Sequence, residues 1–140
     1  MALGDVIGEA NGSATNIEVL SVEEGSPRLK VTLRGSGKAK GVGFTDLITY
    51  TQVQKGEGIL FGEAETVWLT DDGEVCTWKG FGVGRPTSVG GAATFAVAGW
   101  FDTRSSKLAS LNGVACIVEF ETDDNGSYHW TAYEWKHPTW

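Results

Sequence analysis

The chain has few of the residues that most often carry chemistry in proteins. Its 140 residues include only two cysteines, two histidines and one methionine. The cysteines and histidines lack the close spacing of a zinc site. His129 and His137 lie near the C-terminus without a nucleophile motif, and no phosphate-binding lysine motif is present. The sequence therefore predicts neither a metal nor a cofactor.

The chain also lacks an excess of basic residues and any long apolar run. Eleven Lys and Arg stand against 18 Asp and Glu, for a net charge of −7. Such a chain is repelled on average by phosphate backbones and anionic membrane surfaces. No apolar run approaches the roughly 20 residues that span a bilayer, and the start does not resemble a signal peptide. We expect a cytoplasmic protein with reduced cysteines, and neither a nucleic acid nor a membrane as its partner.

Helical periodicity is absent, and short runs of strand-forming residues bounded by turn residues take its place. Eight strands are expected, near Thr15–Val22, Arg28–Arg34, Val42–Gln52, Ile59–Thr70, Glu74–Gly84, Ala93–Phe101, Val114–Thr122 and Tyr128–Trp135. Short connections between them favour one all-β domain over residues 1–140, an eight-stranded antiparallel up-and-down barrel. A β-sandwich is the alternative. Residues 1–12 are predicted to be a flexible lead-in and residues 136–140 a tail, and Gly35-Ser36-Gly37 is predicted to end the second strand.

The longest connection, Asp102–Asn112, has room for one helical turn capped by Asp102 or Thr103. Leu108 and Leu111 would then plug one end of the barrel. The run Gly80-Phe81-Gly82-Val83-Gly84 has glycines at alternate positions. No helix follows it, so we interpret it as a bend or a close packing contact rather than a nucleotide loop.

Several strands are apolar on both faces, among them Ile59-Leu60-Phe61 and Ala115-Cys116-Ile117-Val118. A barrel wall normally shows one face to the core and the other to water. Two apolar faces indicate that part of the outer wall is covered, which a symmetric homo-oligomer, a trimer or a dimer, would achieve.

The chain is rich in aromatic residues, with six Trp, six Phe and three Tyr. They can fill a core or form the flat walls of an apolar pocket. The residues predicted to bind a ligand are Leu20, Phe44, Tyr50, Phe61, Glu63, Trp78, Trp100 and Tyr133. Glu63 and Glu65 share a face with Phe61 by strict alternation, and an inward carboxyl in an apolar barrel would have a raised pKa suited to acid–base chemistry.

The first strand and its turn, Ile17-Glu18-Val19-Leu20-Ser21-Val22-Glu23-Glu24-Gly25-Ser26-Pro27, resemble the start of the allene oxide cyclase barrel. The glycine-rich strands and the connection Leu108–Gly113 are similar to that family's wider relatives, which include uncharacterised bacterial barrels and Diels–Alderase barrels. The resemblance implies catalytic roles for Glu18 and Pro27. Leu20 stands where the family has a water-binding asparagine. The resemblance also implies an apolar cavity, often in a trimer, that shapes a flexible substrate.

The sequence is compatible with three functions. The first is binding of a small hydrophobic molecule in the barrel interior. The second is a cofactor-independent cyclase or isomerase that uses the same cavity, with Glu18 as its acid–base or electrostatic group. The third is a structural or interaction barrel with a filled core. Fold alone does not separate them, because barrels host many functions.

Overall fold

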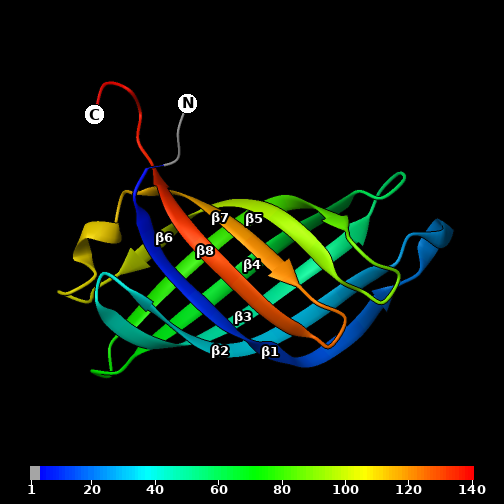
Figure 1. Ribbon diagram of the computed structural model, residues 1–140, viewed down its shortest axis with the longest axis horizontal. Helices are drawn as coiled ribbons and strands as arrows, with labels where there is room; N and C mark the ends of the chain where they lie inside the picture. Colours follow the sequence, from blue (N-terminus) through cyan, green and yellow to red (C-terminus); the bar gives the residue numbers. More distant parts are fainter. Residues whose placement is uncertain (1–3) are drawn as a thin grey trace.

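The computed structural model describes residues 4–140 and shows eight antiparallel strands closed into one barrel (Figure 1). The strands are β1 (Val6–Ser21), β2 (Arg28–Ala39), β3 (Val42–Gln54), β4 (Leu60–Thr70), β5 (Val75–Pro86), β6 (Ala93–Thr103), β7 (Ala115–Thr122) and β8 (Ser127–Trp135). Each strand pairs with the next in sequence, and β8 pairs with β1 to complete the ring. The predicted up-and-down barrel is therefore confirmed. No helix formed by residues 4–140 is long and apolar enough to cross a membrane.

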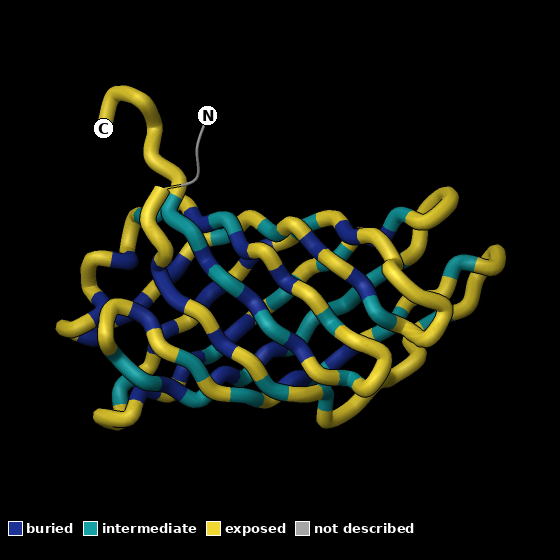
Figure 2. The backbone as a smooth tube through the Cα atoms, in the orientation of Figure 1, coloured by how far each residue is buried: buried dark blue, intermediate teal, exposed yellow. Residues whose placement is uncertain are grey.

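Buried and exposed residues alternate along most strands, as Figure 2 shows. On β3, for example, Phe44, Asp46 and Ile48 are buried, whereas Thr45 and Leu47 between them are only partly buried. This period of two is the consequence of the strand pleat, which sends successive side chains to opposite faces. Residues paired across neighbouring strands share a face, so the register assigns each position to the interior or the outer wall.

Glycines on the inner face make room for large aromatic rings from neighbouring positions. A Cβ atom added to Gly80 would lie 2.5 Å from the ring of Trp78, and one added to Gly99 would lie 2.4 Å from the same ring. A Cβ atom at Gly84 would lie 2.4 Å from the ring of Phe95. The glycine run of β5 is thus a close packing contact, as predicted, and it supplies the small positions that balance large ones inside a narrow barrel.

Two predicted boundaries are wrong, and glycines explain both. β1 begins at Val6, so residues 6–12 belong to the barrel wall instead of a flexible lead-in; residues 1–3 lie outside the described range. β2 continues through residues 35–37 to Ala39. Gly12 pairs with Gly35, and a Cβ atom at Gly35 would lie 2.2 Å from a backbone oxygen and 2.4 Å from the hydroxyl of Tyr128. These glycines permit close approach within strands and do not end them.

One end of the barrel is plugged by the connection between β6 and β7, as predicted. A 3-10 turn at Ala109–Leu111 brings Leu108 and Leu111 into the interior, where they are 0% and 1% exposed. The expected cap by Asp102 or Thr103 is absent, since the turn has no side-chain cap. Instead the Asn112 side chain holds the connection: its Oδ1 accepts from the Thr103 N–H at 2.9 Å and its Nδ2 donates to the Thr103 carbonyl at 2.8 Å.

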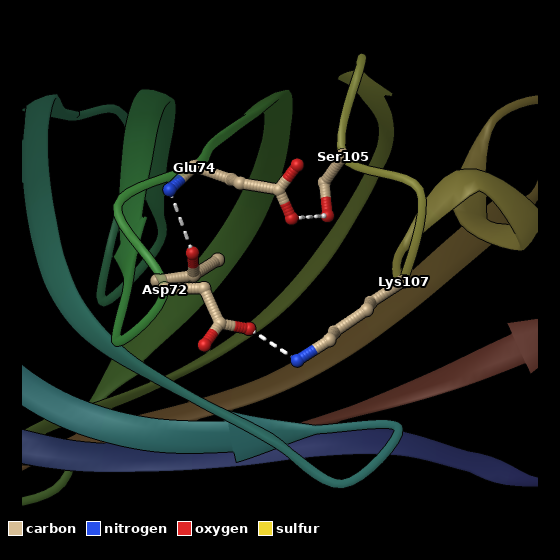
Figure 3. A network of polar contacts seen from close by, with 5 residues as sticks. Asp72, Glu74, Ser105 and Lys107 are labelled. Carbon is tan, nitrogen blue, oxygen red and sulfur yellow. Dashed lines mark hydrogen bonds and ion pairs between the residues drawn. The ribbon is translucent and has the colours of Figure 1, made fainter.

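Polar contacts tie this plug to the turn between β4 and β5 (Figure 3). Ser105, which is buried, donates from its hydroxyl to Glu74 Oε1 at 2.9 Å. Lys107 forms an ion pair with Asp72. The plug is therefore held both to the β4–β5 turn and, through Asn112, to the end of β6. We call this end of the barrel the closed end.

At the other end, β1 extends beyond its partner β8. The β1–β8 pairing covers Val6–Ser13, and the rest of β1 up to Ser21 pairs only with β2. The resulting hairpin projects to the right in Figure 1 and carries exposed apolar side chains, with Ile17 61% and Val19 63% exposed.

Candidate functional site

The barrel interior contains a cavity of about 70 Å³. It is lined by Ile48, Tyr50, Gly62, Glu63, Ala64, Thr66, Trp68, Trp78, Gly82, Phe95, Val97, Phe101, Val118, Phe120, Trp130 and Ala132. One water molecule needs about 10–15 Å³ of such space, so the cavity has room for roughly five. That space holds no more than about one ring, and because the cavity is only partly enclosed, a second fused ring would extend towards its opening. The interior is neither fully filled nor widely hollow.

Stacked aromatic rings fill the interior towards the closed end and form the floor of the cavity. The rings of Phe44 and Trp68 lie 4.1 Å apart at 12°, and those of Trp68 and Trp130 lie 5.9 Å apart at 5°. Phe101 packs against Trp68 at 5.2 Å. Parallel rings of this kind bury much apolar area in a fixed geometry. The floor is therefore flat and rigid.

A buried carboxyl group holds this floor in place. Asp46, 0% exposed, accepts hydrogen bonds at Oδ2 from the Tyr128 hydroxyl at 2.8 Å and the Trp130 Nε1–H at 2.9 Å. Burial raises the pKa of the Asp46 carboxyl above its ordinary value, against the opposing effect of its donors Trp130, Tyr128 and Trp68. The Trp68 indole lies near this carboxyl, but its N–H makes no hydrogen bond of normal geometry within residues 4–140. Asp46 does not line the cavity itself and acts on it by orienting Trp130.

The lining of the cavity is almost entirely apolar, and two of its residues, Tyr50 on β3 and Thr66 on β4, carry hydroxyl groups. Tyr50 packs edge-on against Phe120 at 5.9 Å and tilted against Phe95 at 6.1 Å. Burial raises the pKa of Tyr50 to about 12, so its hydroxyl stays protonated at neutral pH and can donate a hydrogen bond. Thr66 lies on the neighbouring strand, paired with Ile48. The cavity can therefore hold an apolar body, and Tyr50 and Thr66 are the lining residues with a hydroxyl group.

Three of the predicted ligand-binding residues border this cavity: Tyr50, Trp78 and Glu63. Trp78 lies inside, with its ring packed against Gly80 and Gly99. Glu63 is exposed and pairs with Thr51 and the exposed Phe81, so its side chain belongs to the outer wall and its backbone borders the cavity. The expectation of an inward carboxyl on β4 is wrong, because Glu65 is exposed as well.

The remaining predicted residues lie elsewhere. Phe44 is buried in the floor beneath the cavity. Three other aromatic residues lie on the outer wall: Phe61, Trp100 and Tyr133. Phe61 is 40% exposed and Trp100 is 51% exposed. The Lys55 ammonium lies 5.4 Å from the ring centre of Phe61.

The residues that carry the resemblance to allene oxide cyclases also lie outside the cavity. Glu18, Leu20 and Pro27 are exposed on the β1–β2 hairpin and its turn. None of them is among the cavity-lining residues. Glu18 pairs across strands with Lys30, on the outer side of the hairpin.

Sequence reasoning missed Asp46, and one signal could have found it. Residues 44, 46, 48 and 50 alternate as Phe, Asp, Ile and Tyr, which places an acid on the apolar face of a strand. A buried carboxyl is uncommon unless it is hydrogen-bonded, so such a position indicates a specific polar contact.

The described residues offer no evident metal site. Within residues 4–140, no group of three or more His, Cys, Asp or Glu side chains is arranged to hold a metal ion. Cys76 and Cys116 are free and buried, and burial raises the pKa of their thiols to about 11 and about 12. Both thiols are therefore protonated and unreactive at neutral pH.

Solved structures share this architecture. A beta-barrel like protein from Acinetobacter baumannii AYE matches with a TM-score of 0.79 at 15% identity, covering 96% of each chain. A protein with unknown function from Clostridium acetobutylicum ATCC 824 matches with a TM-score of 0.81 at 12% identity, covering 97% of this chain and 100% of that one. An enzyme from Penicillium herquei matches with a TM-score of 0.69 at 17% identity, covering 93% of this chain and 92% of that one.

These likenesses show the fold alone, because the identities are low. No family model and no curated protein matches the chain. The neighbours are thus small β-barrels, and none of the comparisons points to allene oxide cyclases in particular.

Proposed function

We propose that the protein binds a small, largely apolar molecule of one or two rings in the barrel cavity. The observation that carries the proposal is the 70 Å³ cavity bounded by Trp68, Trp78, Trp130 and further apolar side chains. A concave apolar site with a few polar groups is the usual form of a small-molecule site. The flat aromatic floor and the almost wholly apolar lining favour a planar apolar ligand, and we expect Tyr50 and Thr66 to select one that carries a single hydroxyl or carbonyl oxygen.

Binding of 2-naphthol, compared with naphthalene, tests this proposal. Both probes have two rings, and only one has a polar atom. We expect 2-naphthol to quench the fluorescence of the lining tryptophans saturably and to bind more tightly than naphthalene. Tyr50→Phe should reduce that preference about 2–10-fold, the equivalent of one hydrogen bond of about 0.5–1.5 kcal/mol.

Two alanines provide a matched pair of variants for the cavity. Ala64→Leu places three additional carbon atoms in the cavity and should abolish saturable quenching by either probe. Ala109→Leu makes the same change at an exposed position on the plug and should leave binding unchanged. The proposal fails if neither probe binds the wild-type protein, or if Ala64→Leu binds 2-naphthol as the wild type does.

Catalysis in the same cavity is the second candidate function. One structural neighbour, from Penicillium herquei, is described as an enzyme, and that description favours it. A cyclase or isomerase at this site would depend on conformational control of a flexible substrate. The Tyr50 hydroxyl would stabilise developing negative charge by donating a hydrogen bond, since its raised pKa makes it a poor base. Native mass spectrometry of the purified protein can detect a bound molecule. That molecule is then incubated with the wild type and with Tyr50→Phe. Chemical conversion by the wild type but not by the variant would support catalysis over binding.

A cytoplasmic location is part of the same proposal. Its support is the pair of free thiols, Cys76 and Cys116, since unpaired cysteines are typical of reducing compartments.

A further inference from the structure

The outer wall of the barrel has an apolar area that nothing in the described chain covers. Five of its large side chains are substantially exposed: Phe61 40%, Phe81 63%, Val83 40%, Trp100 51% and Trp135 36%. Surface hydrophobic residues scattered singly need no explanation, but a continuous group of them indicates a contact site.

The register shows that these side chains are continuous across β4–β8. Phe61 pairs with Val83, and Val83 pairs with Ala96. A second row joins Phe81, Ala98, Ile117 and Tyr133, and a third joins Trp100, Ala115 and Trp135. We call these residues the apolar wall. Their alanines are exposed and present little bulk, which lets a partner approach the backbone closely there.

We propose that the apolar wall is the contact surface of a two-fold symmetric homodimer. With about 150–250 Å² for a fully exposed aromatic side chain, the five large side chains expose roughly 400 Å² per chain. With the exposed alanines, Ile117 and Tyr133, a two-fold contact would bury roughly 1,000 Å² in total or somewhat more. This area approaches the 1,200 Å² or so at which specific interfaces begin.

The position of the charged surface favours a dimer in which both copies contribute the apolar wall, over a contact between two different faces. The basic outer face of the barrel, with Arg28, Lys30, Arg34 and Lys38, lies on β2. In a ring of eight strands, β2 lies four strands from β6 and therefore on the opposite side from the apolar wall. A contact between those two different faces would not close and would grow into a filament. A contact of the apolar wall with itself closes at two copies.

The mass of the protein in solution, measured by sedimentation equilibrium, tests the dimer. We expect the wild type to be a dimer at micromolar concentration and to remain one in about 1 M NaCl, where exposed charges are screened beyond about 3 Å. Phe81→Glu and Trp100→Glu should each weaken dimerisation at least 30-fold, as expected for an aromatic residue near the centre of an interface. Both variants should keep the wild-type circular dichroism, because the two side chains are exposed.

Control variants separate this surface from other exposed apolar positions. Leu69→Glu and Val75→Glu place the same charge on the outer face of β4 and β5, outside the apolar wall, where these side chains are 42% and 48% exposed. Both should leave the dimer intact. Val19→Glu changes the projecting hairpin, whose free strand edge is the competing contact site.

Three outcomes would overturn the proposal. One is a monomeric wild type at 100 µM or so. Another is a dimer that Val19→Glu dissociates and Phe81→Glu does not. The third is a trimer or an open series of oligomers. Binding of 2-naphthol is independent of all three, because the cavity lies on the inner face of the same strands.

Discussion

A single buried carboxyl group organises the interior at the scale of residues. Asp46 bonds to both Tyr128 and Trp130, and Trp130 forms part of the cavity floor. The Tyr128 ring reaches Asp46 only because Gly12 and Gly35 lack side chains: a Cβ atom at Gly12 would lie 2.8 Å from that ring. Two glycines, two aromatic donors and one acid therefore form one packing unit.

Asp46→Asn should change how stability depends on pH. Burial raises the pKa of Asp46 above its ordinary value of 3.8, so the folded state favours the protonated form. The stability that this group contributes is then fully present below about pH 4 and is lost as pH rises through the raised pKa. Asparagine cannot ionise, so the free energy of unfolding of the wild type should fall relative to that of Asp46→Asn as pH rises from 4. Urea denaturation at several pH values measures the difference.

The contributions of the other carboxyl groups to the pH dependence cancel in this comparison, because the wild type and Asp46→Asn both carry them. Asp102→Asn, at an exposed position, is the control and should follow the wild type at every pH. A wild-type advantage that grew with pH would contradict the prediction, because it would mean that the aromatic donors outweigh desolvation.

At the scale of elements, the plug between β6 and β7 closes one end of the barrel. Leu111→Ala should lower the free energy of unfolding by about 2–5 kcal/mol, since the leucine is 1% exposed and its truncation leaves a cavity. Ser110→Ala, one residue away and exposed, should change it by less than about 0.5 kcal/mol. Urea denaturation of the two variants makes the comparison. A loss below about 1 kcal/mol for Leu111→Ala would mean that the plug does not belong to the cooperative core.

The sequence predicted the elements well where turn residues mark them and poorly where glycines serve packing. Asp71-Asp72-Gly73 and Asn125-Gly126 indicate tight turns, and strands end there because Gly73 and Gly126 adopt positive φ angles of 82°. Gly35 and Gly37 have the same local appearance in sequence but lie inside β2. Close contacts with β1 at both glycines, and with Tyr128 at Gly35, distinguish them from the turn glycines. Those contacts come from distant parts of the chain and are not encoded locally.

At the scale of the whole molecule, the number and order of strands could be predicted, but the choice of inner face could not. On β4, the outer face carries Phe61 together with Glu63 and Glu65, whereas the inner face carries the small residues Gly62 and Ala64 beside Trp68. Eight strands enclose little space, so rings such as Trp78 fit only if neighbouring inner positions are small. A large aromatic residue therefore does not by itself mark the inner face, and this is why Phe61 and Trp100 were assigned to a cavity that they do not line.

Closure of the ring brings the first and last strands together, which allows a test of the whole architecture. The Gly4 N–H donates to the Glu134 carbonyl at 2.7 Å, and the Glu134 N–H donates to the Asp5 carbonyl at 3.0 Å. The start of β1 and the end of β8 therefore lie side by side, as Figure 1 shows. A circular permutant that joins Trp135 to Gly4 by a short linker, with new ends between Gly56 and Glu57, should fold and bind 2-naphthol like the wild type. The cut lies in an exposed turn, where breaks are tolerated.

The matched control for this permutant has its new ends between Ala64 and Glu65, in the middle of β4. That cut interrupts the pairing of β4 with both β3 and β5 and should prevent folding, as measured by circular dichroism and gel filtration. A closed ring has no preferred first strand, so its stability should depend on which pairings are continuous and not on where the chain begins. If the permutant cut at Gly56 failed to fold while its linker was long enough, the β1–β8 seam would instead require the native chain order to form.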